Sequence, residues 1–134
     1  METDVAPPPV GAYVHYRREG DLLFLAGVGP RLPDGSGVAG GATRDEQGNA
    51  LEYDVVAQTE QVVANVRAIL EVAGSRLEKV IDVTVFLTDM QRDFADFNAT
   101  WARHFDGLGV TRTTVEVGAL PTPIAVEFKV VARA

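Results

Sequence analysis

Cysteine is absent from the 134 residues of this chain. Its absence excludes a disulfide framework, a thiolate nucleophile and cysteine-based zinc or iron–sulfur sites. It also agrees with a reducing compartment. The two histidines, His15 and His104, have no metal-ligand spacing to each other or to an acidic residue. We therefore expect neither a metal nor a metal-dependent reaction.

Long apolar runs are lacking as well, since none approaches the roughly 20 residues that a membrane-spanning helix needs. The first nine residues are acidic and proline-rich, without the basic start and apolar stretch of a signal peptide. Positive charge is scarce, because 12 Lys and Arg face 19 Asp and Glu, for a net charge of −7. Such a surface repels phosphate backbones. We expect a cytoplasmic protein that binds neither membranes nor nucleic acids.

The composition that remains is that of an ordinary globular protein, with 46% hydrophobic residues. A chain of this length buries roughly two-thirds of its unfolded surface, so it can fold around its own core. We find no internal repeat and no linker, and we predict a single domain that spans residues 1–134.

The hydrophobic pattern predicts strands and helices that alternate along the chain. Strands are predicted at Val14–Arg18, Leu22–Val28, Val80–Thr88, Thr111–Val117 and Ile124–Ala132, and helices at Asp54–Ala73 and Asp93–Phe105. Interleaved helices imply a sheet with some parallel pairing and both helices on one face, which is an α+β fold. The Gly- and Pro-rich stretch at residues 30–49 is predicted to be a long loop, either functional or a surface decoration.

The strand alternation predicts which side chains share a face of the sheet. Facing the helices we expect Ile81, Val83, Val85, Leu87, Val115 and Val117. On the opposite face we expect Phe86 and either Phe128 or Val130, mixed with Thr84, Arg112, Thr114 and Glu127. Two helices cannot cover both faces, so another subunit is the expected cover of this mixed face.

Two charged strand residues are candidates for chemistry. The planar guanidinium of Arg112 matches a carboxylate in bidentate fashion, although an interface ion pair with Glu116 or with an acid of another subunit is an equally simple interpretation. Glu127 lies in an otherwise apolar strand, where burial would raise its pKa toward neutrality and suit it to acid–base catalysis. Its alternative is an outward-facing residue paired with Lys129 or Arg133.

Other residues carry weaker signals. His104 lies near a helix C-terminus, where it is expected to interact with the helix dipole, whereas His15 lies on a strand beside the candidate site. Gly27 ends a strand, where it permits close approach of a ligand to the backbone or merely a bend. Asn98 lies at the edge of the buried side of the second helix.

A set of short stretches, in order along almost the whole chain, carries a family resemblance. The stretches are Pro8–Tyr13, Gly20–Gly27, Gln58–Asn65, Ala73–Gly74, Val83–Asp89, Phe97–Asn98, Thr111–Val117, Leu120–Pro121 and Val126–Phe128. Each is weak alone, but the ordered set resembles the Rid/YjgF family of imine and enamine deaminases.

The resemblance implies a chorismate-mutase-like (YjgF) fold with the last strand inserted between the Leu22 and Val80 strands. It also implies a homotrimeric barrel with a cleft between each pair of subunits. In the family, the residue at Arg112 binds the substrate carboxylate and the residue at Glu127 positions or activates a water. Residues at Tyr13, Gly27 and Asn98 shape the cleft, and the family uses neither a cofactor nor a metal.

Several positions depart from the common family pattern. Ala12–His15 and Ala26–Val28 replace the usual Pro-Tyr-Ser-Gln and Ser-Gly-Gln, and Thr114 replaces a residue that is often Cys or Ser. The Thr111–Val115 string, His15 and the loop at residues 33–49 look more like the 2-aminomuconate deaminase branch. We accordingly include His15 and Thr114 among the expected substrate-binding residues.

Two functions follow as hypotheses. The first is an enamine or imine deaminase that hydrolyses a small unsaturated amino acid, such as 2-aminomuconate or an aminoacrylate-type imine, to a keto acid and ammonia. Arg112 would hold the carboxylate, and Glu127 would hold the water. The second is a non-enzymatic regulatory trimer that senses a carboxylate metabolite, for which Glu127 would be dispensable.

Overall fold

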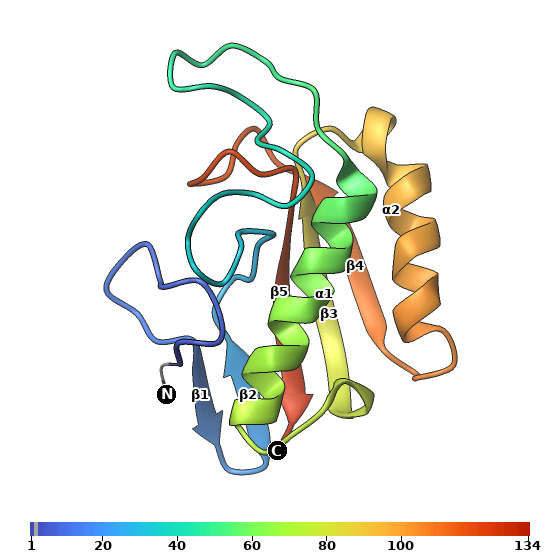
Figure 1. Ribbon diagram of the computed structural model, residues 1–134. Helices are drawn as coiled ribbons and strands as arrows, with labels where there is room; N and C mark the ends of the chain where they lie inside the picture. The colour runs from blue at the N-terminus through green and yellow to red at the C-terminus, as the bar shows by residue number, and fades with distance from the viewer. Residues whose placement is uncertain (2) are drawn as a thin grey trace.

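The fold is one sheet with two helices packed on one of its faces, as the computed structural model of residue 1 and residues 3–134 shows (Figure 1). The strands are β1 (Tyr16–Glu19), β2 (Leu22–Leu25), β3 (Val80–Leu87), β4 (Thr111–Glu116) and β5 (Val126–Arg133). The helices are α1 (Val55–Val72), α2 (Met90–Phe105) and the short 3₁₀ helix η1 (Leu77–Lys79), which the sequence pattern did not predict. None of the described helices is both long and apolar enough to span a bilayer.

The strand order is β1-β2-β5-β3-β4, so the last strand lies between β2 and β3. β3 and β4 run parallel, and every other neighbouring pair is antiparallel. The predictions of an α+β fold, a mixed sheet, two helices on one face and an inserted last strand are therefore confirmed. The insertion matters for the site, because it places β5 at the centre of the sheet.

Helix α1 begins and ends where its sequence predicts. The Asp54 carboxylate accepts hydrogen bonds from the backbone N–H groups of Val56 and Ala57, which caps the first turn. At the other end Gly74 takes a positive φ of 80°, which ends the helix at little steric cost. Between the two ends, an apolar stripe faces the sheet with Val62 and Val66 fully buried.

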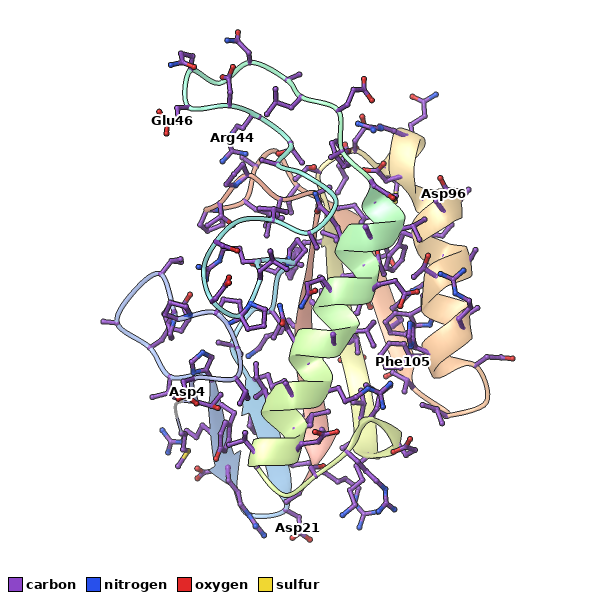
Figure 2. All side chains as sticks on the ribbon, viewed as in Figure 1. Asp4, Asp21, Arg44, Glu46, Asp96 and Phe105 are labelled. Atoms are coloured by element: carbon purple, nitrogen blue, oxygen red, sulfur yellow. The ribbon has the colours of Figure 1, made fainter. Side chains whose placement is uncertain are left out.

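Helix α2 packs on the sheet through aromatic side chains. Phe97 is fully buried and contacts Phe128 of β5 edge to face, with ring centroids 6.1 Å apart. Trp101 stacks on Phe105, and Figure 2 places Phe105 on the side of the helix opposite Asp96. The helix starts at Met90, earlier than the predicted Asp93, because Asp89 caps it by accepting from the Arg92 N–H.

On the central strands β3 and β5, some apolar side chains lie on the face opposite to the one predicted. Phe128 and Val130 are fully buried beneath the helices rather than on the opposite face. Ile81 is 38% exposed and Val80 is buried in its place, because the β3–β5 register shifts between Val80 and Asp82. Val83, Val85 and Leu87 are fully buried as predicted. The error at Ile81 is confined to the irregularity, which strict alternation cannot foresee.

The predicted orientation of strand β4 was also wrong. Its register pairs Arg112 with Val83 and Thr114 with Val85, so both side chains lie on the helix-covered face. Val115, expected beneath the helices, is 37% exposed on the other face. Because β4 is an edge strand overhung by the aromatic side of α2, polar side chains can lie under the helix there.

Candidate functional site

Glu127 is held on the open face of the sheet without a charged partner. It lies on β5 opposite Phe86 of β3 and forms no ion pair with any residue that the structure describes. The expected alternative partner, Lys129, instead donates its ammonium to the backbone oxygen of Leu25. Burial raises the pKa of the Glu127 carboxyl above its ordinary 4.5. A carboxyl that is partly desolvated and lacks a cation is suited to accept and return a proton.

Gly27 provides the surface on which this carboxyl rests. A Cβ added to Gly27 would stand 2.9 Å from Oε2 of Glu127, closer than real contacts allow. The neighbouring residue, Val28, exchanges two backbone hydrogen bonds with Phe128, at 2.8 and 2.9 Å. These bonds draw the Gly27 backbone against β5 after β2 has ended at Leu25. A side chain at this position would push the Glu127 carboxyl away, so glycine permits the close approach of backbone and carboxyl.

A cleft of about 160 Å³ opens beside Glu127. Its walls are formed by Val10, Tyr13, Gly27, Gly29, Arg31, Pro121, Thr122, Ile124 and Glu127. Roughly 10–15 Å³ of such space is enough for one water, so the cleft has room for a small organic acid together with a water. The cleft therefore brings together three of the predicted site residues, Glu127, Gly27 and Tyr13.

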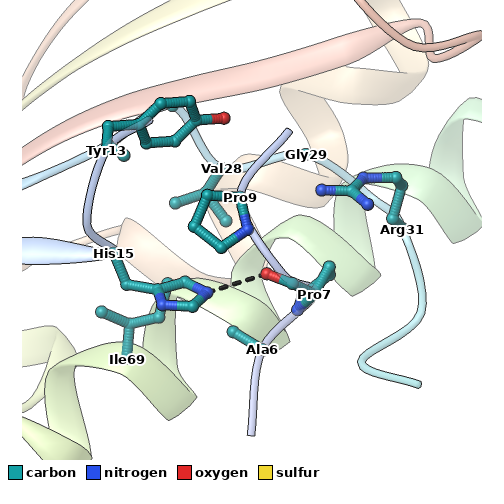
Figure 3. A pocket seen from close by; sticks show the side chains of 11 residues that line it. Ala6, Pro7, Pro9, Tyr13, His15, Val28, Gly29, Arg31 and Ile69 are labelled. Atoms are coloured by element: carbon teal, nitrogen blue, oxygen red, sulfur yellow. Dashed lines mark hydrogen bonds between the residues drawn. The ribbon is translucent and has the colours of Figure 1, made fainter. Parts of the chain in front are cut away.

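Tyr13 reaches the cleft from the N-terminal segment. Its side chain is 44% exposed, and its hydroxyl oxygen accepts a hydrogen bond from the Val10 N–H at 3.2 Å. The hydroxyl hydrogen remains available to a ligand. Tyr13 also lines a smaller neighbouring pocket, which the close-up in Figure 3 shows.

His15 lies in that smaller pocket but is already engaged by the backbone. Its Nδ1 accepts from the Thr3 N–H, and its Nε2 donates to the Pro7 oxygen at 2.8 Å (Figure 3). Both ring nitrogens are used, and the side chain is 7% exposed. His15 thus fastens the proline segment that carries one wall of the cleft, and this contact does not depend on a substrate.

Arg112 lies on the other face of the sheet, inside an aromatic cage. Its guanidinium carbon is 5.0 Å from the ring centroid of Trp101 and 5.3 Å from that of Phe97. It forms no ion pair among the described residues, and Glu116, the acid proposed as its partner, accepts from the Met90 N–H instead. Burial lowers the pKa of the Arg112 guanidinium, which nevertheless stays charged.

Two other predicted residues lie outside the Glu127 cleft, and one of them shares the face of Arg112. The Thr114 hydroxyl points to the same face and is buried without a hydrogen-bond partner in the described part of the chain. Asn98 is exposed on α2, next to Phe97 in the chain. An unpaired guanidinium beside an unsatisfied hydroxyl leaves donors that a carboxylate can accept.

The two charged residues do not meet within one chain. They pair with β3 at Val83 and Phe86, three residues apart, which is about 10 Å along a strand. Their side chains also leave the sheet on opposite faces. One small molecule cannot contact both Arg112 and Glu127 of the same chain.

Buried amides on α1, whose role the sequence did not reveal, fix the walls of the cleft. Gln58 is fully buried, donates to the Gly41 oxygen and accepts from the Ala125 N–H at the start of β5. Asn65 is 1% exposed and donates to the oxygens of Gly29 and Arg31. Polar residues within an apolar helical stripe are the signal that could have identified them, since burial without partners is costly.

Comparison with known proteins places these features in a family. Residues 3–134 match the model of the family described as Endoribonuclease L-PSP. A RutC family protein of Pyrococcus horikoshii is 38% identical over 97% of this chain and 93% of its own length.

Solved structures agree with this match. RidA from an Antarctic Psychrobacter has a TM-score of 0.81 with 30% identity, covering all of this chain and 98% of its own. TdcF of E. coli, solved with bound serine, has a TM-score of 0.79 with 31% identity, covering all of this chain and 97% of its own.

Proposed function

Because this chain belongs to the Endoribonuclease L-PSP family, which includes the RutC and Rid proteins, we propose that it is an enamine or imine deaminase. The substrate is a small unsaturated amino acid, 2-aminomuconate or a related aminoacrylate-type imine. The observation that carries the proposal is the desolvated, unpaired carboxyl of Glu127 against Gly27 in a cleft of small-molecule size.

The chemistry requires one water and no further reactant. The enamine becomes the imine when a proton moves from nitrogen to carbon. Glu127 removes a proton from water as that water attacks the imine carbon, and passes it to the nitrogen to give a carbinolamine. Glu127 then takes the proton of the carbinolamine hydroxyl and returns it to the nitrogen, the carbon–nitrogen bond breaks, and ammonia leaves with the electron pair as the keto group forms. The products are a keto acid and ammonia, and Glu127 regains its starting protonation state.

A carboxylate on the substrate would be held by Arg112. A planar guanidinium fixes a carboxylate in bidentate fashion and so orients the neighbouring imine carbon. The serine bound by TdcF carries such a carboxylate, which supports a ligand of this class. Since Arg112 and Glu127 of one chain lie on opposite faces of the sheet, the arginine acting with a given Glu127 must come from another subunit.

The proposed assembly is a homotrimer with clefts between subunits. The open face of the sheet exposes apolar side chains, Leu22, Phe24, Ile81 and Val115, each 37–38% accessible. Apolar groups spread over one sheet face are typical of a surface that another subunit covers. A closed ring would give every Glu127 cleft an Arg112 from its neighbour.

Mixed oligomers test the shared site. Arg112→Ala and Glu127→Gln subunits, each strongly impaired alone at low substrate concentration, are co-expressed, and their mixing is verified by native mass spectrometry. Random assembly leaves about one cleft in four with both native residues, so ammonia release should return to roughly a quarter of the wild-type rate. Mixed oligomers as inactive as either parent would contradict a site built from two subunits.

A ligand-sensing trimer without catalysis is the second candidate, and the complex of TdcF with serine favours keeping it. It requires Arg112 but not the acid–base role of Glu127. Normal ligand binding together with no ammonia release from any imine tested in the wild type would favour sensing. The family description names an endoribonuclease, but a net charge of −7 opposes binding of an RNA backbone.

A further inference from the structure

Arg31 is a second cation of the Glu127 cleft, and the site as described above gives it no role. It lines this cleft together with Tyr13 and Glu127, and it also lines the smaller neighbouring pocket. Figure 3 shows its guanidinium on the side opposite His15, turned inward toward the proline segment. The residue comes from the long loop after β2, whose irregular sequence offers no pattern from which to predict it.

The backbone that carries Arg31 is firmly held. Its carbonyl oxygen accepts from the buried Asn65 amide at 2.9 Å. The loop also folds back on itself through an isolated bridge between Arg31 and Val38. Because the backbone at Arg31 is already ordered, ligand binding needs to restrict only the side chain, which lowers the entropy cost of the contact.

Internal contacts use only part of the guanidinium. One nitrogen, Nη2, donates to the Pro8 oxygen at 2.8 Å, and no carboxylate of the described residues forms an ion pair with Arg31. A guanidinium has five N–H donors, so most remain available to a ligand in the cleft. Glu127 shares the cleft but stays beyond ion-pair distance, which leaves space between the two groups.

We propose that Arg31 determines substrate specificity by binding a second anionic group at the end of the substrate distant from the reacting carbon. The inference rests on the proposed function, in which Arg112 of a neighbouring subunit holds the first carboxylate beside Glu127. Arg31 and Glu127 belong to one chain and line one cleft, so a substrate placed at Glu127 extends toward Arg31. The preferred substrates are therefore dicarboxylic enamines and imines rather than monocarboxylic ones.

Calorimetry with two unreactive acids tests the proposal. trans,trans-Muconate and sorbate share one diene chain and one carboxylate and differ only at the far end, which is a carboxylate in muconate and a methyl group in sorbate. The wild type should bind muconate more tightly by roughly 10- to 150-fold, the span of a hydrogen bond to a charged group. Arg31→Gln should lose this preference and retain the affinity for sorbate, because it removes the charged guanidinium and keeps a polar side chain at this position.

Arg17→Gln is the matched control. Arg17 is an exposed residue of β1 paired with Glu19, and its replacement changes the net charge by the same amount. This variant should keep the preference for muconate. Equal binding of the two acids by the wild type, no binding of muconate, or equal weakening of both acids in Arg31→Gln would overturn the proposal.

The same titrations separate this inference from the proposed function. Arg112→Ala should weaken both acids alike, because both carry the carboxylate that Arg112 is proposed to hold. If Arg112→Ala binds both normally while Arg31→Gln loses the preference, the Arg112 clamp fails and recognition by Arg31 stands. If the wild type releases no ammonia but discriminates through Arg31, the deaminase proposal fails alone.

Discussion

The two faces of the sheet hold their charged site residues in different ways. On the covered face, Arg112 lies over the rings of α2, with Trp101 the nearest at 5.0 Å. On the open face, Glu127 rests against the backbone of Gly27, where burial raises its pKa. Burial disfavours the charge of both groups. Arg112 is compensated by its contacts with aromatic rings and keeps its charge, whereas Glu127 has no such contact.

This difference suits the two groups to different tasks. A guanidinium that keeps its charge in every state can serve as a permanent anchor for a carboxylate. A carboxyl whose charged and neutral forms are closer in free energy can exchange a proton during a reaction. Removing Glu127 should therefore lower the rate of the chemical step, whereas removing Arg112 should weaken substrate binding.

The largest effect is expected on the open face. Glu127→Gln keeps the size of the side chain and its contact with Gly27 but cannot accept a proton. The rate of ammonia release should fall by about 10²- to 10⁴-fold, while the affinity for sorbate changes little. Single-turnover kinetics and calorimetry on the same preparation check both quantities. A normal rate would remove Glu127 from the mechanism.

A smaller effect, on binding rather than on rate alone, is expected on the covered face. Arg112→Ala should weaken binding of a monocarboxylate by roughly 10- to 150-fold, as the loss of a charge-assisted hydrogen bond costs about 1.5–3 kcal/mol. Arg112→Lys should restore little, because an ammonium lacks the bidentate fork. Arg67→Ala, an exposed arginine of α1, is the control. Full activity of the lysine variant would contradict the clamp.

The sequence determined much of the fold because helix caps and apolar stripes are local signals. Asp54 and Gly74 mark the ends of α1 closely. Alternation, in contrast, tells which residues share a face but not which face is covered, so the side on which Phe128 lies was mistaken. The position of β5 within the sheet followed only from the family resemblance, since strand order depends on contacts distant in sequence.

The candidate site was predicted unevenly for the same reason. An acid inside an apolar strand is a visible anomaly, and it led directly to Glu127. Arg31 lies in a Gly- and Pro-rich loop without periodicity, and its place in the cleft depends on Asn65, more than 30 positions away in sequence. Contacts between residues so far apart in sequence form only in the folded chain, and they leave no periodic signal in the sequence.

The smallest expected effect is on stability, and it again distinguishes the two faces. The pKa of Glu127 is raised in the folded protein, so the folded state binds its proton more tightly than the unfolded state does. The stability that this proton contributes is fully present below pH 4.5, the ordinary value, and is lost as pH rises through the raised folded pKa. At neutral pH the ionised carboxyl therefore destabilises the fold, and Glu127→Gln should be the more stable protein.

The gain should reach at most about 1 kcal/mol once partial exposure of the carboxyl to solvent is allowed for. It should shrink as pH falls toward 4.5, because the wild-type carboxyl then becomes neutral as well. Urea unfolding at several pH values and one fixed protein concentration measures it. Glu46→Gln removes the same charge from the exposed tip of the long loop, which Figure 2 shows, and should give no comparable gain.

Equal stability of wild type and Glu127→Gln at neutral pH would mean that another subunit or bound water compensates the charge on the open face. The contrast with Arg112 would then vanish in the assembled protein.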